Sequence, residues 1–531
     1  MKKFLTRRGS QFVSSIIAVA MLLLLMSAFA ACDWSRNDNP EEQAEVYYSD
    51  FGAIGDGVVD DFDSIYAAHE YANEHNMKVK ADKGAAYYIG AHTETVIVKT
   101  NTDWGNADFI IDDTKVSKQD KGYNVFEIRS DTSSYDLEIP KNYSLQAGQS
   151  NIGMTFETPV MIHLENKNKK DYIRYGANQN SGSTRQEIIL VDANGNVDAD
   201  TPILWDYTEV TKMTVYSVAD EPIVVEGGTF TTISNKETVN AGYYARGINI
   251  KRSNTVLQNV KHYVTGEPTP QADPPADPEP GYSSAPYSGF YSVNSANNVT
   301  ISDCLLTGHT AYRWQKPTGW VTQGTYDTTA ANSNKVSWVN CKQSNDITDQ
   351  TYWGVMSSNF CKNLVMQGCE LSRFDAHQGV YNATIKDTKL GFTFNIIGAG
   401  TLLVENVERL SGSTFLTLRT DYGSTWQGDV IFKDCKMSAG NGFSIIGASW
   451  ADWDFGYTCY LPETVTIENF QANEGAKGYV FSSITGTSLE NVMNSKNPYQ
   501  ITKKVTVSNT QNELQISSNT SGLFAQTAFV K

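Results

Sequence analysis

Positive charge is scarce in this sequence. The 531 residues include 42 Lys and Arg against 59 Asp and Glu, which gives a formal net charge of −17. A chain with this balance has no field to attract the phosphate backbone of a nucleic acid, so the sequence predicts no nucleic-acid partner. The balance also disfavours polyanionic substrates, unless basic side chains gather locally in a groove.

Long apolar runs are absent after the first 32 residues. Within 1–32, basic residues precede the apolar run Phe12–Phe29 and then Ala-Ala-Cys32, a pattern typical of a bacterial secretory signal with a lipidation site. We therefore expect a lipoprotein of the cell envelope or surface, held to the membrane by a lipid on Cys32, with 33–45 as a tether. Ordinary cleavage at Ala28–Ala30 with full secretion, or an uncleaved membrane anchor, are the alternatives.

The segment Ser49–Ala68 carries the most informative motif. Its three glycines permit a tight turn, because glycine tolerates positive φ. Asp60 is then placed to cap a helix that begins at Asp61, with apolar residues along one face. We expect the aspartates of this segment to be turn and cap residues, not catalysts.

The pattern D-F-G-A-x-G-D-G-x-x-D-D-x-x-x-I-x-x-A resembles the opening of the pectate-lyase-like, right-handed parallel β-helix superfamily over residues 46–90. In that group the segment starts the solenoid, and its helix caps the open end. The resemblance implies an all-β protein, a single-stranded right-handed parallel β-helix with an N-terminal capping helix and loop insertions. Asp82 stands where the superfamily usually has a proline.

A short phrase recurs from about residue 240 onwards and supports the same fold independently. Copies include Val-Thr-Ile-Ser-Asp-Cys304, Ala-Thr-Ile-Lys-Asp-Thr388 and Val-Thr-Ile-Glu-Asn-Phe470. The shortest interval between copies is 19 residues, close to one bare coil, and longer intervals are coils with inserted loops. Alternate residues of each phrase are apolar, and Asn, Asp or Gly then marks the turn to the next face.

Six cysteines follow Cys32, and in an exported protein such cysteines invite a disulfide interpretation. The phrase places four of them at one repeat position, so we expect a ladder of small buried thiols instead. Zinc-like spacing is absent, and the sequence predicts no metal site. The ladder cysteines are Cys304, Cys341, Cys369 and Cys435.

The β-helix is expected to span 46–531. Residues 101–235 are less regular, and we expect early coils plus a β-rich elaboration there. The proline-rich stretch 267–287 rules out a coil and predicts a long extended loop. A second family of strands precedes most of the phrases and should form another face of the same helix.

The densest candidate site is Ser372–Gly379. Aligning Gly379 with Gly354 of the previous coil puts Asp375 beside Gln350. Paired carboxylates suit glycoside hydrolysis, with one as acid and the other as base or nucleophile, and proximity raises the pKa of one of them. A turn aspartate and a surface histidine are the alternative. The residues predicted for this patch are Asp346, Asp349, Asp375 and His377, with Trp353 as a further substrate contact.

Two further stretches combine polar and aromatic residues. In Leu418–Trp426, Arg419 would hold a carboxylate or hydroxyls, Asp421 would be a second acid, and Tyr422 and Trp426 would stack on sugar rings. The alternative is an internal Arg–Asp pair that secures a loop. In Thr307–Trp314, the predicted substrate contacts are His309 and Arg313, and aromatic packing of a long loop is the alternative.

The superfamily includes polygalacturonase-like hydrolases and pectate-lyase-like β-eliminating enzymes. None of the polygalacturonase signatures is intact here. A lyase would need a basic residue to take the proton α to a uronate carboxylate, and usually calcium or another cation to neutralise that carboxylate. Arg373, Lys386 and Arg419 are available, but nothing in the sequence selects among them. No catalytic motif is therefore carried over.

These patterns predict an exported glycoside hydrolase that cleaves a polysaccharide or complex glycan without a cofactor. Asp375 would share acid–base work with Asp349 or Asp421, while His377 and Arg419 position the substrate. The first alternative is a polysaccharide lyase, with calcium as its cofactor. The second is a non-catalytic glycan-binding surface protein.

Overall fold

The computed structural model describes residues 44–176, 179–238, 241–269, 283–316, 319–449, 455–482, 497–517 and 523–531. The predicted signal peptide, Cys32 and the tether as far as residue 43 lie outside these ranges. Within them, no helix is both long enough and apolar enough to cross a membrane.

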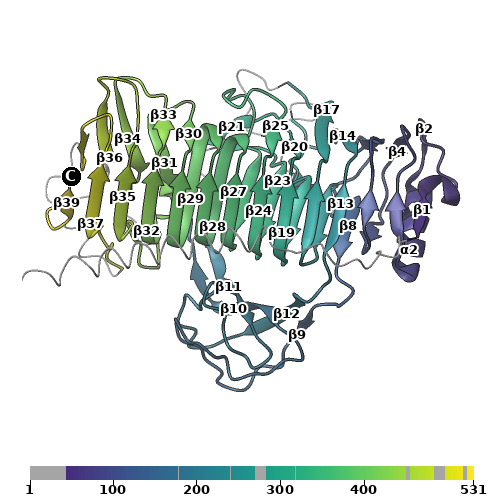
Figure 1. Ribbon diagram of the computed structural model, residues 1–531, viewed down its shortest axis with the longest axis horizontal. Coiled ribbons are helices and arrows are strands. Elements are labelled where there is room, and N and C mark those ends of the chain that lie inside the picture. The colour runs from purple at the N-terminus through teal and green to yellow at the C-terminus, as the bar shows by residue number, and fades with distance from the viewer. Residues whose placement is uncertain are drawn as a thin grey trace, which may run out of the picture. The chain divides into compact units, whose positions relative to one another are not determined.

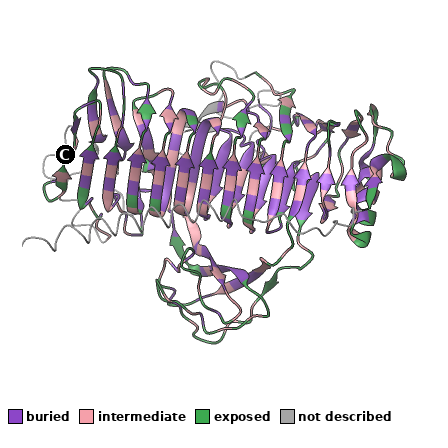
Figure 2. Cartoon of the chain, viewed as in Figure 1, coloured by how far each residue is buried: buried purple, intermediate pink, exposed green. Residues whose placement is uncertain are grey.

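Parallel strands follow one another as successive coils (Figure 1). In one coil β16, β17 and β18 succeed each other, and they pair in parallel with β19, β20 and β23 of the next coil. Each coil thus adds one strand to each of three faces, which confirms the predicted parallel β-helix. Figure 2 shows buried residues along the coils and exposed residues on outlying loops.

Most strands belong to one of the three faces. The first face contains β1 (Glu45–Tyr47), β3 (Lys78–Lys80), β6 (Thr102–Asp103), β13 (Ile223–Glu226), β16 (Thr255–Gln258), β19 (Asn297–Ser302), β24 (Asn334–Val339), β27 (Lys362–Gln367), β32 (Trp426–Lys433), β35 (Thr464–Glu468), β37 (Lys504–Ser508) and β39 (Ala528–Val530). The second contains β2 (Asp56–Asp60), β4 (Ala86–Ile89), β7 (Asp108–Asp112), β14 (Thr229–Ile233), β17 (Lys261–Thr265), β20 (Leu305–Leu306), β25 (Lys342–Gln343), β30 (Glu408–Arg409) and β33 (Lys436–Met437). The third contains β5 (Val96–Val98), β8 (Phe126–Arg129), β15 (Ile248–Lys251), β18 (Tyr291–Asn294), β23 (Thr328–Ala331), β26 (Met356–Asn359), β31 (Thr414–Leu418), β34 (Gly442–Gly447), β36 (Lys477–Phe481) and β38 (Leu514–Gln515). Two long strands, β28 (Glu370–Lys386) and β29 (Lys389–Glu405), contribute to all three faces.

The recurring phrases form the first face. Their third positions stack in register, as Leu257 on Ile301 and Ile301 on Trp338, and all three side chains are fully buried. The residue before the last position of the phrase adopts a left-handed φ, 57° at Asn259 and 53° at Asp303. Asn and Asp tolerate this conformation better than other non-glycine residues, which explains their recurrence at the corner.

The cysteine ladder is confirmed, because its four predicted members are free thiols and buried: Cys304, Cys341, Cys369 and Cys435. The thiol of Cys341 donates to the carbonyl oxygen of Ile301 over 3.4 Å, and that of Cys369 donates to Trp338 over 3.5 Å. Each thiol therefore fills a small interior position and bonds to the coil before it.

The predicted cap is helix α2 (Phe62–His75), preceded by the short helix η1 (Tyr48–Phe51). It begins one residue later than expected. The Asp60 carboxylate accepts the Phe62 N–H, whereas the Asp61 carboxylate accepts the N–H groups of Ile54 and Gly55 and so secures the glycine turn. Asp82, in the usual proline position, accepts hydrogen bonds from Ser49 and Tyr87.

An insertion separates β8 from β13, narrower than the predicted 101–235. It is an antiparallel sheet of β9 (Tyr135–Asp136), β10 (Val160–Asp171), β11 (Ser183–Val191) and β12 (Lys212–Ser217) with its own apolar core (Figure 1). A buried ion pair ties it to the coils, since Lys362 Nζ lies 2.8 Å from Glu187 Oε2. Of the proline-rich loop, 270–282 lies outside the described residues. A second hairpin, β21 (Tyr312–Lys316) and β22 (Gly319–Gln323), lies in the following loop.

A candidate site in a polar groove

The third face positions the candidate site. Asp375 of β28 is in register with Ser357 of β26 and Asn395 of β29, not beside Gln350. The predicted alignment of Gly379 with Gly354 is therefore wrong. Gly354 lies in the turn before β26, where a Cβ would meet the Arg373 side chain at 2.0 Å, so it is not a repeat position.

An open groove of about 380 Å³ follows the outer side of the third face. One polar residue of each coil stands in register along it, at a spacing of about 4.8 Å, the distance between neighbouring strands. Hydroxyl and amide groups at such a spacing can bind an extended, hydroxyl-rich chain. The groove is lined by Asn249, Ser292, Thr329, Ser357, Tyr326 and His377, among others.

Asp375 lies at the end of this groove and is fully buried. Its carboxylate accepts hydrogen bonds from Arg419 Nη1 at 2.9 and 3.0 Å, and also from Arg373. Burial alone would raise the pKa of Asp375, but the charges of Arg373 and Arg419 outweigh it and hold that pKa well below its usual range. Asp375 is therefore an ionised acceptor and not a proton donor.

Arg419 connects this carboxylate to Asp421. Its Nη2 lies 2.9 Å from Asp421 Oδ2, while Arg174 of the insertion donates to the same oxygen over 2.6 Å. Burial opposes ionisation of Asp421, but hydrogen bonds and charge from Arg419 lower its pKa. Asp375 and Asp421 do come together as predicted, yet both remain ionised. Neither has the raised pKa that a general acid needs.

His377 is a titratable residue that lines the groove. Its Nε2 lies 2.7 Å from Asp375 Oδ2 and 2.9 Å from the Tyr326 hydroxyl, and the side chain is 21% exposed. The Nε2–H donates to the carboxylate, so Nδ1 carries the lone pair. Within the described chain, Nδ1 has no hydrogen-bond partner. Burial lowers the pKa of His377 below 6.5, and the attraction of Asp375 does not restore it, so the ring is neutral at pH 7.

Aromatic side chains hold the arginine beside this histidine. The Arg373 guanidinium lies 4.3 Å from the centre of the Trp353 ring and 5.9 Å from that of Tyr326. Trp353, predicted as a substrate contact, therefore packs against Arg373. Two positive charges, Arg373 and Arg419, therefore stand next to a neutral imidazole.

The other predicted carboxylates lie apart from this cluster. Asp346 and Asp349 accept hydrogen bonds from Thr348 and Thr351 in local turns. In the described chain neither contacts Asp375 or His377. Because the register differs from the predicted one, the expected patch of Asp346, Asp349 and Asp375 is corrected: only Asp375 belongs to the site.

Several predicted sugar contacts are buried. The Tyr422 ring packs between Arg174 and Arg419, with its centre 5.4 and 5.3 Å from the two guanidinium carbons. Trp426 is fully buried, and so neither ring can stack on a sugar as expected. His309 is only 2% exposed and belongs to a separate buried cluster. The side chain of Arg313 lies outside the described part of the chain.

Sequence reasoning did not place two members in this site. Tyr326 precedes a third-face strand, and its position after a long loop gave no signal of its partner. Arg174 comes from the insertion, and no local motif relates it to Asp421. By contrast, Asp375 and His377 are two residues apart on one strand, which is why the sequence could pair them.

These features define a parallel β-helix protein with a polar groove on one face. No known protein family matches the chain, and no curated protein matches it. Among solved structures, the tailspike gp49 from Pseudomonas phage LKA1 is 12% identical with a TM-score of 0.45, over 90% of this chain and 83% of that one. The Gp54 tailspike of Acinetobacter baumannii bacteriophage AP22, in complex with capsular saccharide, is 9% identical with a TM-score of 0.39, over 91% and 79%.

The A-module of the Azotobacter vinelandii mannuronan C-5 epimerase AlgE4 is also similar. It is 12% identical with a TM-score of 0.34, over 89% of this chain and 99% of that module. At these identities and scores the likenesses carry no argument about activity. The fold itself rests on the strand pairing described above.

Proposed function

We propose that the groove binds an extended acidic glycan and that His377 removes a proton from it, which makes the protein a polysaccharide lyase. The observation that carries this proposal is the geometry of one ring. Asp375 and Tyr326 contact Nε2 of His377, a residue that lines the groove, so the lone pair is left on Nδ1. A buried carboxylate that orients a histidine in this way selects the tautomer that can act as a base.

The proposed reaction is a β-elimination. Nδ1 of His377 takes the proton at C5, α to a uronate carboxylate, the C4–O bond breaks, and the departing oxygen takes a proton from solvent. Arg373, Arg419 and Arg174 together outnumber the ionised Asp375 and Asp421 by one, three against two, and this surplus positive charge favours the uronate carboxylate and the charge that develops on it. The chain's overall negative charge is thus offset locally at the site.

Calcium does not fit this site. A calcium ion takes several oxygen ligands, usually from carboxylates. Asp375 and Asp421 already accept hydrogen bonds from Arg373, Arg419 and Arg174, so a cation would have to compete with three arginines for their oxygens. The two arginines next to His377 carry the charge neutralisation in this proposal.

A hydrolase with paired carboxylates is the second candidate. It is favoured by the shared contact of Asp375 and Asp421 with Arg419. The arginines that bring the two carboxylates together also lower both pKa values, which removes the protonated acid that hydrolysis requires. The elimination therefore explains more of the geometry than the hydrolysis does.

The test compares two histidine variants of the full chain on a panel of uronic-acid polymers. Unsaturated products absorb near the ultraviolet edge, so their appearance is followed directly. We expect His377→Gln to lose turnover by at least about 100-fold, the scale of a general base. His92→Gln is the matched control, because His92 is 24% exposed and lies 2.9 Å from Asp60, in a similar pair away from the groove.

Product chemistry separates the candidates. Saturated products that depend on Asp375 and Asp421 would establish the hydrolase. Glycan binding without any released product would instead make this a binding protein of the surface. Unchanged turnover in His377→Gln would remove His377 from the mechanism.

We further propose that residues 1–32 direct export and that Cys32 carries a lipid, as the sequence pattern suggests. Growth with a labelled fatty acid should label the wild-type protein and leave Cys32→Ala unlabelled. Release of an unlabelled wild-type protein into the medium would show ordinary secretion instead.

A further inference from the structure

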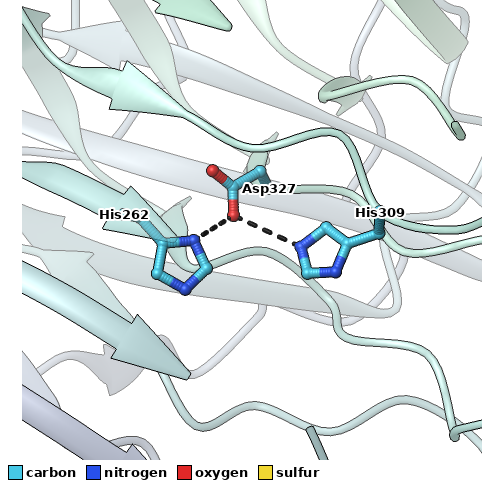
Figure 3. A group of neighbouring side chains, drawn as sticks. All are labelled: His262, His309 and Asp327. Carbon is cyan, nitrogen blue, oxygen red and sulfur yellow. Dashed lines mark hydrogen bonds and ion pairs between the residues drawn. The ribbon is translucent and has the colours of Figure 1, made fainter. Parts of the chain in front are cut away.

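A second cluster lies inside the coils, separate from the groove. His262 of β17, His309 after β20 and Asp327 before β23 are 2%, 2% and 0% exposed. Nδ1 of His262 lies 2.5 Å from Asp327 Oδ1, and Nε2 of His309 lies 3.4 Å from the same oxygen. Figure 3 shows both rings turned toward this carboxylate. One donor atom from each residue lies within 4.8 Å of the other two.

The second nitrogen of each histidine and the second oxygen of Asp327 also have hydrogen-bond partners. His262 Nε2 lies 3.0 Å from the Thr232 hydroxyl, and His309 Nδ1 lies 2.9 Å from Glu267 Oε1. Asp327 Oδ2 accepts the Thr307 N–H over 2.6 Å. Outer partners of this kind fix the tautomer and the orientation of metal-binding histidines, and a carboxylate behind the ring makes it a stronger ligand.

Ring stacking adds to this preorganisation. The His262 ring lies face to face with Phe290, with centroids 3.7 Å apart, and the His309 ring stacks on Tyr287 at 6.1 Å. The two imidazoles therefore have little freedom to turn away from Asp327. Their inner nitrogens already converge on Asp327 Oδ1.

We propose that His262, His309 and Asp327 form a structural site for a zinc-like divalent transition metal. Two imidazole nitrogens and one carboxylate oxygen are donors that Zn²⁺ accepts, and water would complete four-coordination. Hard cations such as Ca²⁺ and Mg²⁺ prefer six or more oxygen donors, which this cluster does not offer. The negative charges of Asp327 and Glu267 balance the charge of the cation.

The competing occupant of the cluster is a proton. Burial disfavours the charged form of His309, but Glu267 and Asp327 outweigh it and raise its pKa to about 9. A protonated His309 between two carboxylates would satisfy the same hydrogen bonds. The two explanations differ in whether the folded chain takes up metal, which the experiment below measures.

The site would join the bases of two long loops. Glu267 stands just before the undescribed segment 270–282, while His309 and Asp327 stand on either side of the loop that carries β21 and β22. Tyr326, which contacts His377, immediately precedes Asp327. A metal bound here therefore acts as a positioning element for the groove and not as a catalytic ion.

The experiment uses the full chain, stripped with a chelator and then titrated with Zn²⁺ against a chromophoric competitor. We expect one equivalent to bind, Co²⁺ to give the visible absorption of a four-coordinate site, and Zn²⁺ to raise the thermal unfolding temperature. Asp327→Asn and His262→Gln should abolish binding. Glu267→Gln, which alters only the outer partner, should weaken it by about 10–100-fold.

His69→Gln is the matched control. His69 is fully buried in α2, and its Nε2 lies 2.9 Å from the Tyr48 hydroxyl. Among the described residues it has no carboxylate partner, so its replacement should leave metal binding unchanged. Metal binding by the chelator-treated wild-type chain tests the proposal even if the ligand variants do not fold. Failure of folded wild-type protein to bind Zn²⁺ and Co²⁺, or undiminished binding in Asp327→Asn, overturns the proposal.

Discussion

Tyr326 and Asp327 are consecutive residues whose side chains join two different clusters. The Tyr326 hydroxyl lies 2.9 Å from His377 Nε2 at the groove, whereas Asp327 Oδ1 lies 2.5 Å from His262 Nδ1 inside the coils. The backbone between these two residues therefore links the base of the proposed reaction to the proposed metal site. Replacing either residue tests one cluster at a time.

Tyr326→Phe and Asp327→Asn should differ in their effect on stability. Loss of the phenol hydroxyl removes hydrogen bonds to His377 and Asp375 and should cost about 1 kcal/mol of unfolding free energy. Asp327→Asn removes a buried charge and one of the two acceptor oxygens, so two buried histidines and the Thr307 N–H compete for the oxygen that remains, and the change should cost about 3 kcal/mol. Urea unfolding of metal-free protein measures both. Equal losses would show that Asp327 is not the centre of its cluster.

Asp375→Asn should impair both stability and turnover. The substitution removes the charge that Arg373 and Arg419 face in a fully buried position, so we expect a loss of about 3 kcal/mol in unfolding free energy. It also removes the acceptor that selects the His377 tautomer, so kcat should fall by roughly 100-fold or more. Asp349→Asn is the control, because the Asp349 carboxylate accepts hydrogen bonds from Thr351 in its own turn and, among the described residues, contacts neither Asp375 nor His377. A variant as stable and active as wild type would refute the role of Asp375.

Much of the fold was predictable because each coil of a β-helix has the same structure, and the same pattern of residues therefore recurs along the sequence. Each phrase alternates buried and outward residues, and its corner residue needs a left-handed φ, so Asn259 and Asp303 are visible without a structure. The cysteine ladder followed from the same repeat. The repeat did not reveal the register of the third face, because loops of unequal length precede its strands. Gly354 stands in one of these loops.

The candidate site was predictable only where its parts are local. Asp375 and His377 share a strand, and Arg419 and Asp421 share a turn, η3 (Thr420–Tyr422). Arg174 reaches Asp421 across 247 residues through the docking of the insertion, which no short pattern records. The pKa values were also misjudged, because arginines around a carboxylate reverse the effect of a neighbouring carboxylate.

The pH dependence of turnover should report His377. The proposed base works only when neutral, so kcat/KM should fall as the pH drops through its pKa, which burial places below 6.5. Asp375 is the group that raises this pKa, so in Asp375→Asn the acid limb should move to still lower pH. Profiles of kcat/KM for both proteins give the comparison. An acid limb above 6.5, or an upward shift in the variant, would contradict the assignment.

His69 should make the cap sensitive to acid. Burial lowers its pKa from 6.5 to about 3, so between these values the unfolded chain binds a proton that the folded chain does not. Stability therefore rises with pH in this window and is lost on acidification, by about 2 kcal/mol between pH 7 and pH 5 from this group alone. Urea unfolding at the two pH values should show a smaller loss in His69→Gln. The same loss in both proteins would assign the acid sensitivity to other groups.

Gly428→Ala should destabilise the stacking of coils. Gly428 has a φ of 139°, and a Cβ there would meet the Gly400 carbonyl oxygen of the preceding coil at 2.2 Å. Backbone cannot yield as a flexible side chain would, so we expect a loss of about 1–3 kcal/mol in unfolding free energy. Gly440→Ala is the matched control, because its Cβ would meet nothing within 4 Å. Denaturant unfolding of both variants checks this, and equal stability would mean that the coils separate locally to admit the methyl group.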